Sequence, residues 1–176
     1  KVAHPYFNML PPVAIQESTS FRVGIAWQGN KRHDLDVYRS FPLRLLEKLA
    51  ATPNVTLVSL QAGNGCEQVA DVDFSIETPD LNDGMQSFSH TSQLVASLDL
   101  VITCDSAMVH LAGAMGVPTW LALSCSSDWR WGIGADGSHW YPSVRLFRQA
   151  TYDGWSKVFD AMAAALTPLV LQKTID

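Results

Sequence analysis

The sequence predicts an α/β fold with a doubly wound, mostly parallel sheet of about five or six strands. Short apolar runs alternate almost throughout with segments whose apolar residues recur at helical spacing. The run Leu100–Cys104 is apolar without alternation, which is typical of a parallel strand covered on both faces. A length of 176 residues with 47% hydrophobic content suits one domain with its own core.

The first predicted strand is 21–28, and a polar loop over 29–39 follows it. Ser40 and Pro42 favour the start of a helix, which ends before the breaker Pro53. The apolar residues of this helix recur at helical spacing, namely Leu43, Leu46, Leu49 and Ala50.

The middle of the chain continues the alternation. Residues 55–60 form the second predicted strand, and 72–76 is a weaker candidate for a third. A helix is expected over 89–98, with Leu94, Val95 and Leu98 on one face.

The last predicted elements follow the strand at Leu100–Cys104. A helix over 107–115 ends at Gly116, with Pro118 just beyond it. We expect strands at 119–123 and 144–147, a loop between them, and a final helix over 155–166. This gives three segments: a linker (1–20) that holds three of the nine prolines, the domain (21–167) and a C-terminal tail (168–176).

Composition excludes several classes of function. The net charge of −5 gives no bulk attraction to nucleic acid or to an anionic membrane. No apolar run approaches the roughly 18 residues of a membrane span. The three cysteines, Cys66, Cys104 and Cys125, have no metal-ligand spacing, and their odd number argues against a disulfide framework. We therefore expect a cytoplasmic protein without a bound metal.

The turn at Asp105 and Ser106 carries the strongest signal for a binding site. Ser106 and His110 are four residues apart, so they share one face of the helix that begins at Ala107. The free N–H groups and the positive dipole end of a helix favour an anion such as phosphate. The alternative is an ordinary helix cap with an unrelated histidine. Metal ligation by His90 and Asp105 would require folding to bring them together, and nothing favours that.

Two further segments are candidates. Gly29 and Asn30 follow the first strand and precede several cations, of which Arg39, beside Ser40, suits a bidentate contact to phosphate. Gln61 follows the second strand at the same predicted sheet edge. The alternative for the first segment is a simple turn and a solvated loop.

The sequence contains a third group of interest, an aromatic cluster in the loop between the last two predicted strands. Its members either pack the loop onto the sheet, which we favour, or stack a nucleobase; they are Trp129, Trp131, Trp140 and Tyr141. Neither a Walker A motif nor a Gly-x-Gly-x-x-Gly fingerprint occurs.

The segment Asp99–Gly116 resembles the Asp-(Thr/Ser)-x-x-x-His segment of the heptosyltransferase-like glycosyltransferases of family 9. The resemblance is closer still to bacterial relatives fused behind tetratricopeptide repeats, and it covers about residues 21–166. Four further segments match those relatives in order: Arg39–Leu43, Ser59–Gln61, Asp128–Trp131 and Trp140–Gln149.

The resemblance implies the C-terminal half of a GT-B enzyme, a Rossmann-like domain that binds a nucleotide-diphosphate sugar. It implies that Asp105 meets the donor sugar, that Ser106 and the N–H of Ala107 hold the diphosphate, and that His110 and Arg39 support it. It implies no metal and no cofactor, because the helix N-terminus and side chains neutralise the leaving diphosphate. Ser106 and Cys104 replace the usual Thr and Val.

The function expected is therefore donor binding in an inverting glycosyltransferase that transfers a hexose or heptose. The catalytic residues are unknown, because the family's base lies in an N-terminal half outside this chain. That half, or a tetratricopeptide-repeat region, is the expected protein partner. The alternatives are a non-catalytic nucleotide-sugar-binding module and an enzyme of the nucleotide-sugar epimerase type.

Overall fold

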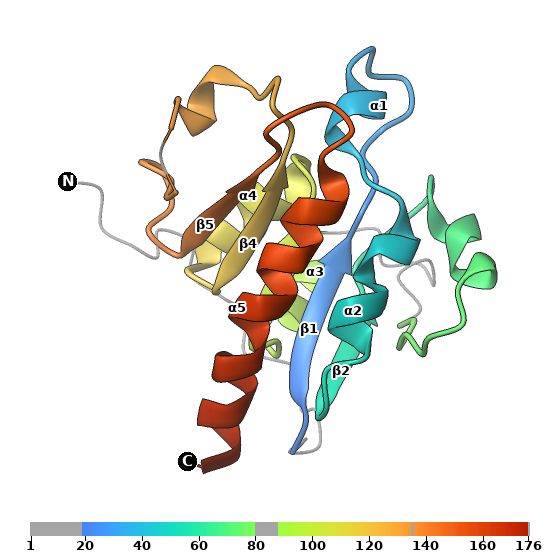
Figure 1. Cartoon of the computed structure of the whole chain (residues 1–176). Coiled ribbons are helices and arrows are strands. Elements are labelled where there is room, and N and C mark those ends of the chain that lie inside the picture. The colour runs from blue at the N-terminus through green and yellow to red at the C-terminus, as the bar shows by residue number, and fades with distance from the viewer. Residues whose placement is uncertain (1–18, 80–87, 135, 176) are drawn as a thin grey trace.

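Five parallel strands form one sheet in the order β2-β1-β3-β4-β5 in a computed structural model, which describes residues 19–79, 88–134 and 136–175 (Figure 1). In the centre of the sheet, Val23 lies opposite Leu57 on one side and Leu100 on the other. The strands are β1 (Phe21–Ala26), β2 (Val55–Ser59), β3 (Leu100–Thr103), β4 (Thr119–Leu123) and β5 (Val144–Arg148).

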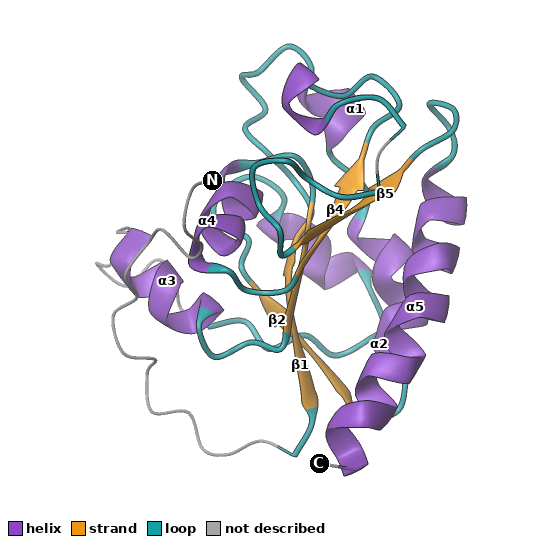
Figure 2. Cartoon of the chain, turned by 90° about the vertical axis from the view of Figure 1, so that its left-hand side faces the viewer, coloured by secondary structure: helices purple, strands orange, loops and turns teal. Residues whose placement is uncertain are grey.

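Helices cover both faces of the sheet, as the doubly wound prediction requires. The helices α2 and α5 lie on one face, and α3 and α4 lie on the other (Figure 2). Their bounds are α1 (Asp36–Arg39), α2 (Glu47–Ala50), α3 (Phe88–Val95), α4 (Ala107–Met115) and α5 (Trp155–Ile175). Short 3₁₀ helices occupy Leu43–Leu46, Cys66–Asp71 and Trp129–Trp131.

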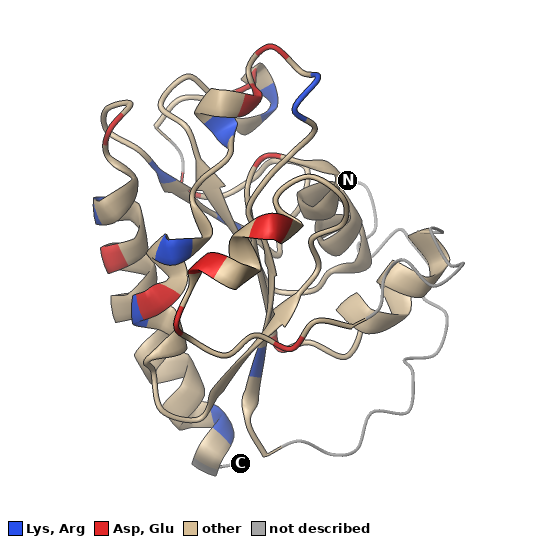
Figure 3. Ribbon diagram, turned by 90° about the vertical axis from the view of Figure 1, so that its right-hand side faces the viewer, with Lys and Arg blue, Asp and Glu red and all other residues tan. Residues whose placement is uncertain are grey.

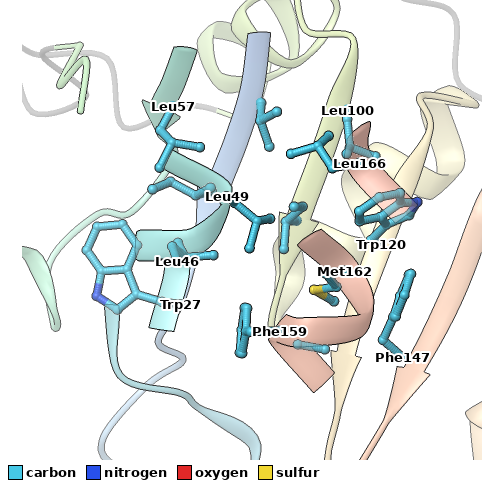
Figure 4. Close-up of a cluster of buried hydrophobic side chains, with 14 of the residues drawn as sticks. Trp27, Leu46, Leu49, Leu57, Leu100, Trp120, Phe147, Phe159, Met162 and Leu166 are labelled. Atoms are coloured by element: carbon cyan, nitrogen blue, oxygen red, sulfur yellow. The ribbon is translucent and has the colours of Figure 1, made fainter. Parts of the chain in front are cut away.

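The larger core cluster lies between the sheet and the pair α2 and α5 (Figure 4). Leu49 of α2 and Met162 and Leu166 of α5 are fully buried in it. A second cluster lies on the other face, where Val95 of α3 and Ala112 of α4 pack against Val101 of β3. The burial of β3 on both faces confirms the interpretation of its unbroken apolar run.

The predicted strand at 72–76 is wrong. The segment follows the 3₁₀ helix Cys66–Asp71, and its neighbour Glu77 makes only an isolated parallel bridge to Val58. Within the described residues the sheet therefore ends at β2. The polar loop 29–39 also contains a short helix, α1, that the sequence analysis did not predict.

The final helix does not end at Leu166 as predicted, but continues past Pro168 to Ile175. Proline removes one backbone hydrogen bond from a helix interior. Contacts beyond it favour the continuation, because Val170 is buried in the core and the Lys173 ammonium reaches Asp99 Oδ2 at 2.6 Å. The segment bounds 1–20, 21–167 and 168–176 remain predictions, and 1–18 lie outside the described residues.

No helix in the described part of the chain is both long and apolar enough to cross a membrane. The same described residues contain no group of three or more His, Cys, Asp and Glu side chains arranged to hold a metal ion.

Candidate functional site

The strand order places a topological switch point between β1 and β3. From β1 the chain passes to β2 on one side, and later to β3 on the other side. Ligands of open α/β sheets bind outside the carboxyl ends of the strands at such a point. A cleft of about 620 Å³ lies there. It is lined by segments after all three strands: 28–32 with Arg39, 60–64, and 106–108.

The cleft is cationic although the chain is acidic overall. Lys31, Arg32 and Arg39 line it, and none of the described lining residues is acidic. Figure 3 shows both basic (blue) and acidic (red) residues in this loop and in α1, at the upper end of the molecule. Lys31 forms an exposed ion pair with Glu67, at 2.8 Å. The local charge therefore favours an anionic ligand.

Arg39 is held by a buried carboxylate. Its Nε donates a hydrogen bond of 3.0 Å to Oδ1 of Asp36, which is only 4% exposed. A guanidinium has five N–H donors, so the bond at Nε leaves the Nη groups for a second partner. The sequence analysis missed Asp36. Its only sequence signal was its position three residues before Arg39 on a short helical turn.

Gly29 is required for this arrangement. A Cβ atom at Gly29 would lie 2.4 Å from Asp36 Oδ1 and 2.7 Å from Arg39 Nη2. Both distances are too short for non-bonded atoms. The absence of a side chain at this position therefore lets Asp36 and Arg39 pack directly against the backbone of the cleft.

Gln61 and Ser40 form hydrogen bonds that hold the loops around the cleft in place. The buried Gln61 side chain accepts from the N–H groups of Trp27 and Gln28, and donates to the carbonyl oxygens of Gln28 and Asn64. It thus joins the loops that follow β1 and β2. Ser40 Oγ accepts a 3.1 Å hydrogen bond from the N–H of Gly29, and Ser40 is not among the residues that line the cleft.

The N-terminus of α4 closes the third side of the cleft. Ser106 has the extended backbone of an N-cap residue, and its Oγ accepts from the N–H of Met108 at 3.4 Å. The same Oγ lies 3.3 Å from Thr103 Oγ1. Ser106, Ala107 and Met108 all line the cleft, so the predicted helix cap and the predicted cationic loop do meet.

Asp105 and His110 are not among the residues that line this cleft. Asp105 Oδ2 accepts a hydrogen bond of 3.0 Å from Trp131 Nε1. His110 Nδ1 is hydrogen bonded to the Tyr141 hydroxyl at 3.0 Å, and its ring stacks on Trp131 at 5.7 Å between centroids. Six of the predicted site residues therefore come together in the cleft: Gly29, Asn30, Arg39, Gln61, Ser106 and Ala107. Asp105 and His110 instead contact Trp131 and Tyr141 of the aromatic cluster.

Burial changes the acid–base properties of two groups near the site. Burial lowers the pKa of His110, and the charge of Asp105 opposes this in part. Burial raises the pKa of the Cys104 thiol to about 12. Cys104 thus stays protonated at neutral pH and packs as a small buried hydrophobic side chain.

No protein-family model matches the chain. The chain is 32% identical to the curated protein FlbA of Caulobacter vibrioides over 149 residues, which is 82% of this chain and 25% of FlbA. The chain thus spans about a quarter of the length of that relative.

Two solved structures from E. coli are similar to the chain, each at 15% identity and over 91% of its length. Heptosyltransferase WaaC with ADP matches with a TM-score of 0.60, and the chain covers 46% of it. ADP-heptose lipopolysaccharide heptosyltransferase II matches with a TM-score of 0.64, and the chain covers 49% of it. The chain therefore has a heptosyltransferase-like, Rossmann-like α/β fold.

Proposed function

We propose that this chain is the donor-binding, C-terminal half of an inverting glycosyltransferase of the GT-B type, and that its cleft binds a nucleotide-diphosphate sugar. The observation that carries the proposal is the meeting of three cations and the N-terminus of α4 at the switch point of the sheet. The similarity to a heptosyltransferase that was solved with ADP gives further support.

The chemistry of the cleft suits a diphosphate. Arg39 offers a planar fork of donors whose direction the buried Asp36 carboxylate fixes. The N–H groups at the start of α4 add oriented dipoles, and Ser106 adds a hydroxyl. Because these groups neutralise a leaving diphosphate, we propose that donor binding requires no metal and no further cofactor.

The acceptor and the general base are proposed to come from another part of a longer protein. Inverting transfer requires a base within hydrogen-bonding reach of the acceptor hydroxyl, on the face opposite the leaving diphosphate. None of the described residues that line the cleft is a carboxylate or a histidine. We propose a second GT-B half or a tetratricopeptide-repeat region as the partner, in a bacterial cytoplasmic protein.

Isothermal titration calorimetry with ADP, UDP, GDP and CDP tests this proposal. At least one of them is expected to bind the purified chain. Arg39→Lys keeps the charge and loses the fork, so its affinity is expected to fall about tenfold, since a charge-assisted hydrogen bond contributes roughly 1.5–3 kcal/mol. Arg44→Lys is the matched control, because Arg44 is exposed and lies outside the cleft.

The variant Ser106→Ala is expected to weaken binding as well, and to lower stability by about 1 kcal/mol through loss of the helix cap. If no nucleoside diphosphate binds, or if Arg39→Lys and Ser106→Ala bind as tightly as the parent chain, the cleft is not a diphosphate site.

A further inference from the structure

A second, smaller pocket of about 180 Å³ lies beside the cleft. We call it the aromatic pocket. Four aromatic side chains, one imidazole and one guanidinium line it: Trp129, Trp131, Trp140, Tyr141, His110 and Arg130. An apolar cavity of about 150 Å³ is large enough to hold benzene, so the aromatic pocket has room for one six-membered ring.

The walls of the aromatic pocket combine a fixed base with an exposed rim. Trp131 is fully buried, and its indole N–H is bonded to Asp105. Trp129 and Trp140 are 73% and 51% exposed, and their rings meet edge to face at 6.3 Å between centroids. Exposed aromatic side chains next to a pocket are typical of a surface that gains buried area when a ligand binds.

Polar groups are placed at the same rim. His110 uses Nδ1 for its hydrogen bond to Tyr141, and no residue in the described segments bonds to its Nε2. Arg130 pairs with Asp128 at 2.8 Å, is exposed, and lies over the Trp129 ring. Aromatic faces with a few polar donors at the edge fit a ligand that has C–H faces and hydroxyl groups.

Helix α4 connects the aromatic pocket to the cleft. Ser106 at its N-terminus lines the cleft, and His110, one turn further along, lines the aromatic pocket. Asp105 joins the two sites directly, since it precedes Ser106 and accepts from Trp131. The two sites therefore share residues of α4 that are one helical turn apart.

We propose that the aromatic pocket binds the pyranose ring of a sugar, with its C–H faces against Trp129 and Trp140 and its hydroxyl groups toward His110 and Arg130. A sugar fits better than a nucleobase, because the edge-to-face arrangement of the two tryptophans offers no parallel slot for a flat ring. The proposal rests on the proposed function, and it assigns sugar recognition to the segment 129–141. The ring belongs either to the donor or to a glycosidic acceptor.

The experiment measures the sugar's contribution separately from that of the diphosphate. The dissociation constants of ADP, UDP and GDP are compared with those of ADP-glucose, UDP-glucose and GDP-mannose by calorimetry. For a donor sugar, at least one sugar nucleotide binds at least fivefold more tightly than its parent diphosphate. Trp140→Ala and Trp129→Ala are expected to bring that ratio close to one. Phe88→Ala is the control, because Phe88 is an exposed aromatic residue that lines neither site.

A second arm uses the unmodified chain and so does not depend on the folding of a variant. Methyl glycosides of glucose, mannose, galactose and N-acetylglucosamine are titrated while the indole N–H signals of the tryptophans are followed by NMR. Shifts of Trp129 and Trp140 without nucleotide support the proposal and identify the sugar as a glycosidic acceptor. Shifts that appear only with a sugar nucleotide support it and identify the donor.

The inference is overturned if neither sugar nucleotides nor glycosides shift these indole signals, or if sugar nucleotides alone shift them and the affinity ratio of every pair is unchanged in both tryptophan variants. Its failure is distinguishable from that of the proposed function. Diphosphate binding without a sugar effect refutes the aromatic pocket alone. A sugar effect without diphosphate binding refutes the proposed function alone.

Discussion

Gly29 lies next to Asp36 and Arg39, which form an ion pair at the cleft. A methyl group there would overlap Asp36 Oδ1 and Arg39 Nη2, so the pair would separate or the loop would shift. We predict that Gly29→Ala lowers affinity for a nucleoside diphosphate at least fivefold, measured by calorimetry. Gly137→Ala is the control, because a Cβ at Gly137 meets no atom within 4 Å. Equal affinities in both variants would show that the Asp36–Arg39 geometry is irrelevant to binding.

Burial lowers the pKa of the His110 imidazole. Its pKa in the folded chain lies below its ordinary value near 6.5, so the imidazole is neutral at pH 7. The unfolded chain takes up this proton at a higher pH than the folded chain. The stability that His110 contributes is therefore present above pH about 6.5, and it is lost as the pH falls through the lower folded pKa.

We predict that an NMR titration of the His110 ring protons has its midpoint below the ordinary histidine value near 6.5, because burial lowers the pKa. A midpoint for His110 at or above that ordinary value would mean that the pocket does not bury the ring. It would also restore His110 as a cation for a phosphate group.

His110 lies outside the cleft, and residue spacing alone could not predict this. Spacing four residues apart correctly places Ser106 and His110 on neighbouring turns of α4. It gives no information on Trp131 and Tyr141, which come from a loop more than 20 residues further along and occupy the space around the imidazole. Asp36 was missed for the same reason, because its burial depends on tertiary packing.

Gly113 of α4 packs against Tyr141, and this contact decides how a side chain at position 113 would change the stability of the chain. Gly113 is in the helix interior, where alanine is ordinarily more stable by roughly 1 kcal/mol. A Cβ here would lie 2.6 Å from Tyr141 Cγ. We therefore predict that Gly113→Ala destabilises the chain, by about 1–3 kcal/mol, as measured by urea unfolding.

The matched test repeats the substitution in a Tyr141→Ala background. Removing the ring removes the overlap, so the same Gly113→Ala change is expected to become neutral or stabilising there. A destabilisation of the same size in both backgrounds would contradict the contact between α4 and Tyr141.

Elements with local start and stop signals were predicted closely. The bounds of α4 and β4 agree with the prediction, because Ser106 caps α4, Gly116 ends it in a left-handed conformation and Pro118 prevents continuation. The segment 72–76 has apolar residues, but within the described part of the chain it joins no strand, and only the next residue, Glu77, makes a bridge to Val58 of β2. Helix α5 extends past Pro168 because contacts distant in sequence, such as Lys173 with Asp99, outweigh the local signal.

At the scale of the whole molecule, the chain supplies one α/β sheet and covers about half of each similar heptosyltransferase structure. We predict that the 176-residue chain binds the donor but does not transfer sugar in multiple turnovers. The physical reason is that none of the described residues that line the cleft is a carboxylate or a histidine that could act as the base of the proposed reaction. The measurement is chromatographic detection of a glycosylated acceptor, with slow hydrolysis of the donor as the largest activity expected.

Multiple-turnover transfer by the isolated chain would contradict this prediction. The base would then be sought among four described loop residues, namely His33, Asp34, Asp128 and His139. Individual alanine variants of these four residues would identify it.

The central claim is that a nucleoside diphosphate binds where the cationic loop meets the N-terminus of α4. The most direct test is an NMR titration of the amide signals with the nucleoside diphosphate that binds most tightly. The largest shifts are predicted at Gly29, Asn30, Ala107 and Met108, with smaller shifts at Asn64 and none at the remote Ala51. Binding without shifts at these four amides, or with its largest shifts on another face, would contradict the account.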